Sequence, residues 1–114
     1  MGWFILEQAL SKYYNNIFNL LINNIMNKLK EKALKLGATD LKKSTRKNKR
    51  LMVKYNNKWI HFADPRKIAF IDHGDNKRRK NYMNRASGIK NKKGQKTYKL
   101  KTSANFWSYN LLWM

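Results

Sequence analysis

Two arginines and a tyrosine at helical spacing are the residues of this chain whose types and positions best suit chemistry. Arg78, Tyr82 and Arg85 stand at i, i+4 and i+7, so a helix over this segment would place them on one face. An arginine fork binds phosphate through two parallel hydrogen bonds, and a tyrosine ring between two forks can stack on a base or hydrogen-bond a phosphate. The spacing predicts a surface for a nucleic-acid backbone. The alternative is a solvated helix with Tyr82 packed inward.

His61 and His73, with Asp72 and Asp75, form a second group that could do chemistry. Two histidines and a carboxylate can hold iron or zinc, yet no further close ligand is evident and the neighbouring lysines and arginines repel a cation. We therefore expect no metal, no cofactor and no catalytic residue, and a protein that is not an enzyme. His61 is expected to be structural, paired with Asp64 or Asp75. A metal-dependent nuclease at His61, His73 and Asp75 is the enzymatic alternative.

Positive charge dominates the C-terminal part of the chain. The 114 residues include 26 Lys+Arg and 6 Asp+Glu, a formal net charge of +20, and 21 of the basic residues but only three acidic ones lie in 41–114. So many positive side chains repel one another in a compact domain, so a polyanionic partner that neutralises them is expected. The chain has no cysteine, which excludes a Cys-type zinc finger and a thiol nucleophile.

The polyanion is expected to be bound without sequence specificity, because no zinc finger, basic zipper or RNP-type aromatic motif is present. Lysines and arginines of the basic segments, with one tyrosine between them, are the predicted contacts. The predicted nucleic-acid-binding residues are Lys42, Lys43, Arg46, Lys47, Lys49, Arg50, Arg78, Arg79, Tyr82, Arg85, Lys90, Lys92 and Lys93.

A long amphipathic helix is predicted over residues 4–36, which contain neither glycine nor proline, and Gly37 is its natural stop. Apolar residues recur at helical spacing along one side, and six asparagines fall on the other. The asparagines interrupt the apolar run, so we do not expect a membrane-spanning helix, although contact with a membrane surface stays open. The apolar side is expected to be covered by a second copy of the chain or by a shell protein.

The remaining elements are predicted from alternation and capping signals. Residues 40–50 lack periodicity and indicate a solvated linker or a phosphate-contacting arm, whereas 51–62 alternate around Asn56-Asn57 and predict a hairpin with a tight turn. Asp75 is a candidate N-cap for a helix that stops at Gly88, and Ser103 for a last short helix. The aromatic C-terminal run, 106–113, is expected to supply core.

The predicted fold class is therefore α+β, with a long N-terminal amphipathic helix, one β-hairpin and one or two short C-terminal helices. Residues 1–39 form the amphipathic helical segment in this interpretation, and 40–114 form a small basic α+β domain.

Three segments carry a resemblance to a known family. They are KWIHFADPR at 58–66, HGDNKRRKNYMNRASGIK at 73–90 and TSANFWSYNLLW at 102–113. In this order they resemble an uncharacterised family of small basic proteins of nucleocytoplasmic large DNA viruses, over about 44–113. Ala63 stands where such relatives usually have glycine, so a less sharp bend after the second strand is expected.

The resemblance implies a viral origin and a place in the virion, or in the viral factory or host cytoplasm before assembly. Together with the charge, it leads us to expect a non-enzymatic virion component that binds viral genomic nucleic acid or an acidic virion protein. The alternative is a minor capsid or scaffold protein whose long helix bridges shell proteins.

Overall fold

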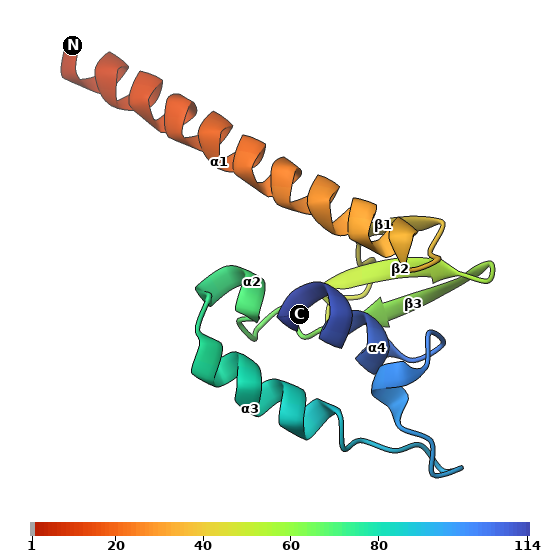
Figure 1. Ribbon diagram of the computed structural model, residues 1–114. Helices are drawn as coiled ribbons and strands as arrows, with labels where there is room; N and C mark the ends of the chain where they lie inside the picture. The colour runs from red at the N-terminus through yellow and green to blue at the C-terminus, as the bar shows by residue number, and fades with distance from the viewer. Residues whose placement is uncertain (1) are drawn as a thin grey trace.

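The computed structural model describes residues 2–114, with side chains described for 14–17 and 19–114. It is a mixed α+β structure, as the sequence predicts. A long helix, α1 (Gly2–Lys35), projects from a body that contains a small antiparallel sheet and several short helices (Figure 1). No described helix is long and apolar enough to cross a membrane.

Helix α1 ends at Lys35, and Gly37, the predicted stop, follows its C-terminal end. Gly37 has a φ of +105°, its N–H bonds the Leu34 carbonyl, and the Ala38 N–H reaches back to the Ala33 carbonyl. These two bonds form a Schellman motif, which favours glycine in the left-handed region. Among the described side chains of α1, those of Leu29 and Ala33 in its last turns are buried against the body. The division of the chain into 1–39 and 40–114 stays a prediction.

The sheet contains the predicted hairpin and one further strand. Strands β2 (Leu51–Tyr55) and β3 (Lys58–Phe62) meet at Asn56-Asn57, whose φ values of 50° and 63° suit a type I′ turn. The prediction of a single hairpin was incomplete, because β1 (Asp40–Lys43) pairs antiparallel with β2. Leu41 is the one apolar residue of β1, so the strand gives no alternation signal, and its pairing is set by the free edge of β2.

The short helices begin at the predicted caps. Asp75 accepts hydrogen bonds from the N–H groups of Lys77 and Arg78, and Ser103 accepts one from Asn105. The helix that begins after Asp75 ends at Ala86, with Ser87 as its C-cap, directly before the predicted stop at Gly88. The elements are α2 (Phe70–His73), α3 (Asn76–Ala86), a 3₁₀ turn (Thr97–Lys99) and α4 (Ala104–Ser108), which continues as a π-helical segment (Tyr109–Trp113).

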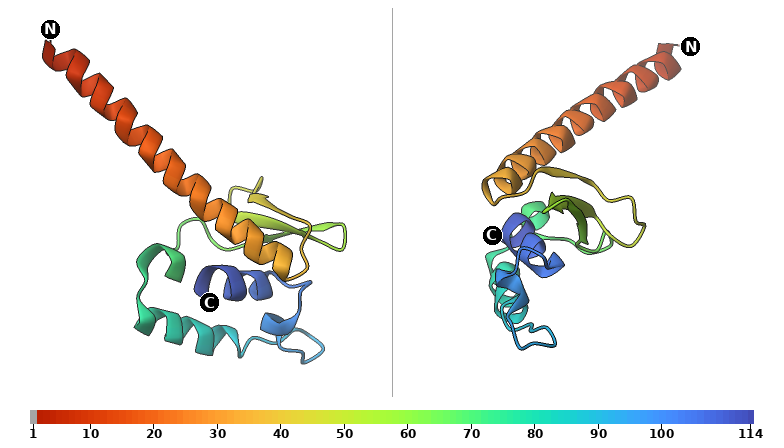
Figure 2. Two further views of the ribbon diagram at one scale, coloured as in Figure 1. Left: turned by 45° about the horizontal axis from the view of Figure 1, so that its top comes forward. Right: turned by 90° about the vertical axis from the view of Figure 1, so that its right-hand side faces the viewer.

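The core lies where this C-terminal helix, 104–113, meets the inner face of the sheet. Phe62 and Val53 of the sheet and Trp107 of the helix are fully buried, and the Trp107 indole N–H donates to the Lys101 carbonyl at 2.7 Å. The expectation that the aromatic C-terminus supplies core is confirmed. The helix lies between the sheet and α3, and the end of α1 packs beside it (Figures 1 and 2).

The core role of the C-terminal helix predicts unequal effects for two leucine truncations. Leu111 is 1% exposed and Leu20 on α1 is 61% exposed. Leu111→Ala should lower the free energy of unfolding by about 2–5 kcal/mol, because it leaves a cavity. Leu20→Ala should change it by about 0.5 kcal/mol or less. Urea denaturation followed by Trp fluorescence measures both, and equal effects would show that the C-terminal helix is not core.

Candidate nucleic-acid interface

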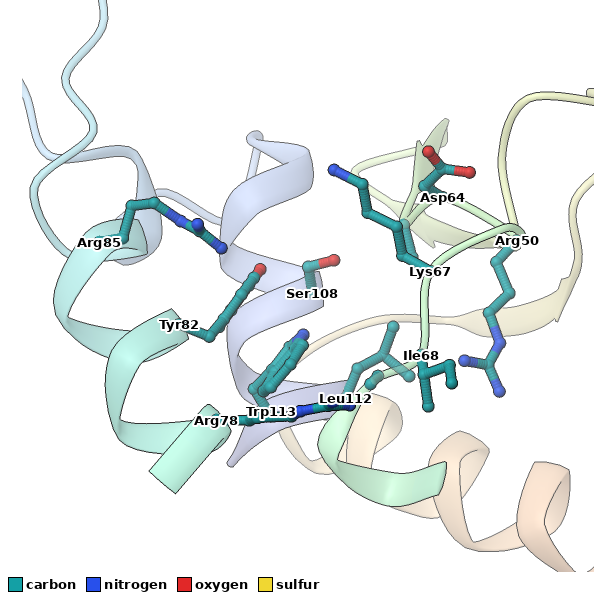
Figure 3. A pocket seen from close by; sticks show the side chains of 12 residues that line it. Arg50, Asp64, Lys67, Ile68, Arg78, Tyr82, Arg85, Ser108, Leu112 and Trp113 are labelled. Atoms are coloured by element: carbon teal, nitrogen blue, oxygen red, sulfur yellow. The ribbon is translucent and has the colours of Figure 1, made fainter. Parts of the chain in front are cut away.

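Helix α3 presents its predicted face to a hollow in the surface. Arg78, Tyr82 and Arg85 all line a hollow of about 460 Å³, which is closed on the other sides by the 63–69 loop and the C-terminal helix (Figure 3). The Asp75 cap starts the helix and so sets which residues face the hollow. The helical spacing therefore predicted this shared face correctly.

Tyr82 does not stand free between the two arginines. Its ring stacks on Trp113, with centroids 4.1 Å apart and planes inclined by 8°. Burial raises the pKa of the Tyr82 hydroxyl, an effect opposed by the neighbouring Ser108 hydroxyl and by the positive charge of Arg85. One face of the Tyr82 ring is thus occupied by Trp113, and contact of Tyr82 with a nucleic acid stays a prediction. The C-terminal end of the chain brings Trp113 onto α3, a contact that no local spacing reveals.

The rim of the hollow is mostly cationic, although the Asp64 carboxylate also lines it. Arg85 and Lys67 extend from opposite sides toward the space above Ser108 (Figure 3). No described carboxylate lies within 4 Å of either charge, and Arg78 is only loosely paired, with Nε 3.8 Å from Asp75 Oδ2. Lys67 and Ser108 were missed by the sequence reasoning, because nothing in their spacing links them to α3.

The loop that carries Lys67 begins with an unusual backbone turn. Ala63 has a φ of +67°, in the left-handed region that glycine favours and other residues enter at a cost. The expectation of a less sharp bend at this alanine was wrong, because the backbone takes the glycine-like conformation. The Ala63 carbonyl accepts from the Arg50 N–H at 3.0 Å, which holds the turn against the start of β2.

Arg50 lines the same hollow but is engaged within the fold. Its guanidinium forms two parallel hydrogen bonds to Asp72, at 2.7 and 2.8 Å, and points away from Lys67 (Figure 3). Asp72 also accepts from the Ala69 N–H at 2.8 Å. The bond from Arg50 lowers the pKa of Asp72 despite its partial burial, and the same pair raises the pKa of Arg50. The predicted phosphate contact is thus a structural pair between β2 and α2.

Arg79 also lies outside the hollow, although it is next to Arg78 in the chain. Its Nε donates to the Trp113 carbonyl at 2.7 Å, and its guanidinium sits 5.2 Å from the centre of the Phe70 ring. Consecutive residues of a helix point about 100° apart, so Arg79 faces the body of the protein. It contributes to the placement of α3 and not to the rim.

A second basic surface covers the outer face of the sheet. The Lys42 and Lys54 ammonium groups lie 4.8 and 5.8 Å from the centre of the Trp59 ring, close enough for cation–π attraction. The sequence reasoning did not name Trp59 and Lys54 as binding residues. They are nevertheless a cross-strand pair, and a hairpin that turns at Asn56-Asn57 places them on one face of the sheet.

His61 stands on the same outer face, beside the β1–β2 loop. Its Nδ1 is 2.7 Å from the Ser44 hydroxyl, so the expected pairing with Asp64 or Asp75 was wrong. Ser44 follows β1, the strand that the sequence did not predict. Desolvation lowers the pKa of His61, as do the positive charges of Arg46 and Lys49. The histidine thus sits among the predicted arm residues and joins no acidic cluster.

The remaining predicted contacts are exposed lysines. Lys43 ends β1, and Lys47 stands in the loop after it. Lys90, Lys92 and Lys93 belong to a loop whose turn is held by the Asn91 side chain, which accepts from the N–H groups of Lys93 and Gln95. The predicted residues therefore separate into the hollow, the outer sheet face and this loop, with Arg50 and Arg79 in structural roles.

The residues of the nuclease alternative do not come together. His73 Nδ1 accepts from the Asp75 N–H at 2.8 Å and its ring packs against Trp113, whereas His61 is bound to Ser44 on the sheet. Among the described side chains, no three His, Asp or Glu are close enough to hold a metal ion. This alternative has no assembled site in the described part of the chain.

Comparison with known proteins gives one similarity. Residues 39–86 match a family of unknown function, DUF5754. The match runs from β1 through α3 and covers less than half of the chain, so α1 and the C-terminal helix lie outside it. It includes the first of the three segments on which the viral resemblance rests and most of the second, but not the third. No curated protein and no solved structure matches the chain.

The Arg50 and Asp72 pair predicts a pH-dependent stability. A lowered native pKa means that the unfolded chain binds the proton more readily, so Asp72 stabilises the fold above its ordinary pKa and loses this contribution as the pH falls through its native pKa. Asp72→Asn should cost about 1–2 kcal/mol at neutral pH, and the difference from wild type should shrink below about pH 4. Urea titrations across pH measure this.

Asp64→Asn is the matched control, because Asp64 pairs with the exposed Arg66. It should cost less than Asp72→Asn at neutral pH, since exposed ion pairs are screened by water. A pH-independent difference between wild type and Asp72→Asn would contradict the prediction.

Proposed function

We propose that this chain is a non-enzymatic protein that binds nucleic acid through the phosphate backbone, without reading base sequence. The observation that carries the proposal is how the few carboxylates of 41–114 are used. Asp64, Asp72 and Asp75 are each engaged with an arginine of the fold. Most of the 21 basic residues of this region therefore have no described carboxylate to neutralise them.

Nucleic acid is the polyanion that suits these surfaces best. Lysine and arginine contacts to phosphate position a protein on a strand and carry no sequence information, which agrees with the absence of a base-reading motif. The outer sheet face adds an aromatic ring, Trp59, between two lysines, an arrangement found where bases stack on proteins. Viral genomic nucleic acid and a place in the particle are part of the proposal and rest on the resemblance alone. An acidic virion protein is the rival partner.

A second candidate function is a bridging or scaffold role for α1. Leu21, Ile22 and Ile25 are between 42% and 55% exposed. By helical spacing they continue the same side of the helix that docks on the body through Leu29 and Ala33. Contiguous apolar surface of this kind on a soluble protein marks an interaction site.

The occupant that we propose for this side is a second copy of α1, antiparallel to the first. Residues 13–27 carry no charged side chain, so two such helices approach without repulsion. Interfacial membrane helices, in contrast, carry Lys and Arg on their polar side. Antiparallel pairing puts the two basic bodies at opposite ends of a helix about 50 Å long, several Debye lengths of about 8–10 Å apart.

Sequence-independent binding should appear as a strong salt dependence. Duplex DNAs of unrelated sequence should bind with similar affinity, and if about 6–8 phosphates are neutralised, log K should fall against log salt with a slope of about −5 to −7. Fluorescence anisotropy at several salt concentrations measures this slope. A slope near zero, or a strong preference for one sequence, would overturn the proposed function.

The association proposal is tested by removing the exposed apolar side of α1. The variant Leu21→Ser/Ile22→Ser/Ile25→Ser should be monomeric in sedimentation velocity, whereas wild type should dimerise, and DNA binding should persist. Leu20→Ser/Leu34→Ser, on the opposite side of the helix, is the control and should dimerise like wild type. A monomeric wild type, or one that assembles only on vesicles or on an acidic protein, would contradict pairing between copies.

A further inference from the structure

The hollow beside α3 has a polar floor, which its apolar surroundings do not explain. Ser108 is 9% exposed and is the buried polar side chain among those that the structure describes. It lines the hollow together with Tyr82 and is close enough to the Tyr82 hydroxyl to affect its pKa. Each of these two hydroxyls carries one O–H donor that a bound group can use. An acceptor placed above Ser108 would satisfy its donor.

The cations around the floor favour a negatively charged acceptor. Lys67, Arg78 and Arg85 line the rim. The Asp64 carboxylate also lines it, but Asp64 is paired with Arg66, so the rim keeps an excess of positive charge. Arg85 is close enough to the Tyr82 hydroxyl to affect its pKa, so rim and floor belong to one site. Hydrogen bonds from charged donors to an anion are about twice as strong as neutral ones.

The backbone at the floor departs from regular helix at the same place. From Tyr109 to Trp113 the C-terminal helix is π-helical, and the Met114 N–H bonds the Tyr109 carbonyl at 3.0 Å. Such wide turns are rare and occur frequently at functional sites. Here the wide turn directly follows Ser108 and lets Leu112 and Trp113 line the hollow with it.

The shape and the walls of the hollow decide which phosphate enters it. Its volume of about 460 Å³ is that of a small-ligand pocket. Ile68, 60% exposed, and Leu112 offer apolar walls for a sugar or a base. A duplex is a broad, stiff cylinder whose phosphates can touch the rim but not the buried Ser108. We propose that this hollow binds the phosphate of an unpaired nucleotide in a single strand, an inference that rests on the proposed function.

Single strands and duplexes therefore test the hollow directly. The probes are a fluorescent oligothymidylate and a duplex, measured by anisotropy at one salt concentration. Lys67→Gln/Arg85→Gln should weaken single-strand binding by about tenfold or more, equivalent to about 1.4 kcal/mol per tenfold, with a clearly smaller loss on duplex. Ser108→Ala, which changes no charge, should weaken single-strand binding alone. Thermal unfolding of each variant verifies that it folds.

The matched control removes two charges elsewhere. Lys92→Gln/Lys93→Gln should weaken both probes by the same factor, because these exposed lysines lie outside the hollow. Equal losses from the control pair and the hollow pair on both probes would overturn the inference and leave the proposed function standing. Failure of wild type to bind either probe would overturn the proposed function itself.

A free nucleotide separates the two sources of phosphate. Thymidine monophosphate should shift the Trp113 indole resonance in an NMR titration only weakly, and the oligothymidylate should shift it strongly at lower concentration. Tight binding of the free nucleotide, with no response to the strand, would assign the hollow to a small phosphate ligand and contradict the inference.

Discussion

The burial of the inner face of the sheet under the C-terminal helix is the interaction on which the rest of the structure depends. A sheet of three short strands is not stable unless one face is covered. Trp107, Leu111 and Leu112 provide that cover over Val53 and Phe62. Helices α2 and α3 and the C-terminal end of α1 all contact this C-terminal helix, so it determines their positions. The basic surfaces thus owe their geometry to apolar contacts in the core.

The last turn of this helix also decides which side of α3 faces outward. Tyr82 stacks on the Trp113 ring, and Arg79 donates to the Trp113 carbonyl. With these two residues held inward, Arg78 and Arg85 are left to line the hollow. Trp113 therefore contributes to the orientation of a helix that carries five cations, together with the bond from the Asn105 side chain to the Ala86 carbonyl. The positive charge is not neutralised inside the fold and stays available to a partner.

Local signals made much of the fold predictable, and contacts between distant segments account for what was missed. Gly37, the Asn56-Asn57 turn and the Asp75 cap each act within a few residues, so the sequence shows them directly. Strand β1 has one apolar residue and depends on its neighbour for pairing, which leaves no pattern to detect. The four residues of α2 are too few to show a helical period.

The candidate site also has a part that the sequence predicts and a part that only tertiary contacts bring together. The α3 side of the hollow follows from helical spacing, and that side was predicted. The other walls come from the 63–69 loop and from Ser108, which reach the hollow only through tertiary packing. Arg50 and Asp72 stand 22 positions apart, and charge type alone does not distinguish a paired arginine from a free one. Composition therefore predicted a basic surface correctly but could not assign its members.

Charge links the two proposed activities through the same electrostatics. Association through α1 brings two strongly positive bodies onto one assembly, and their mutual repulsion opposes pairing. A polyanion that neutralises both bodies removes that repulsion, so it strengthens association, and by thermodynamic reciprocity association strengthens its binding by the same factor. Two bodies on one strand also gain avidity, because the second contact becomes intramolecular. A helix whose middle part, residues 13–27, is uncharged, joined to a basic body, is the arrangement in which each interaction promotes the other without any shared residue.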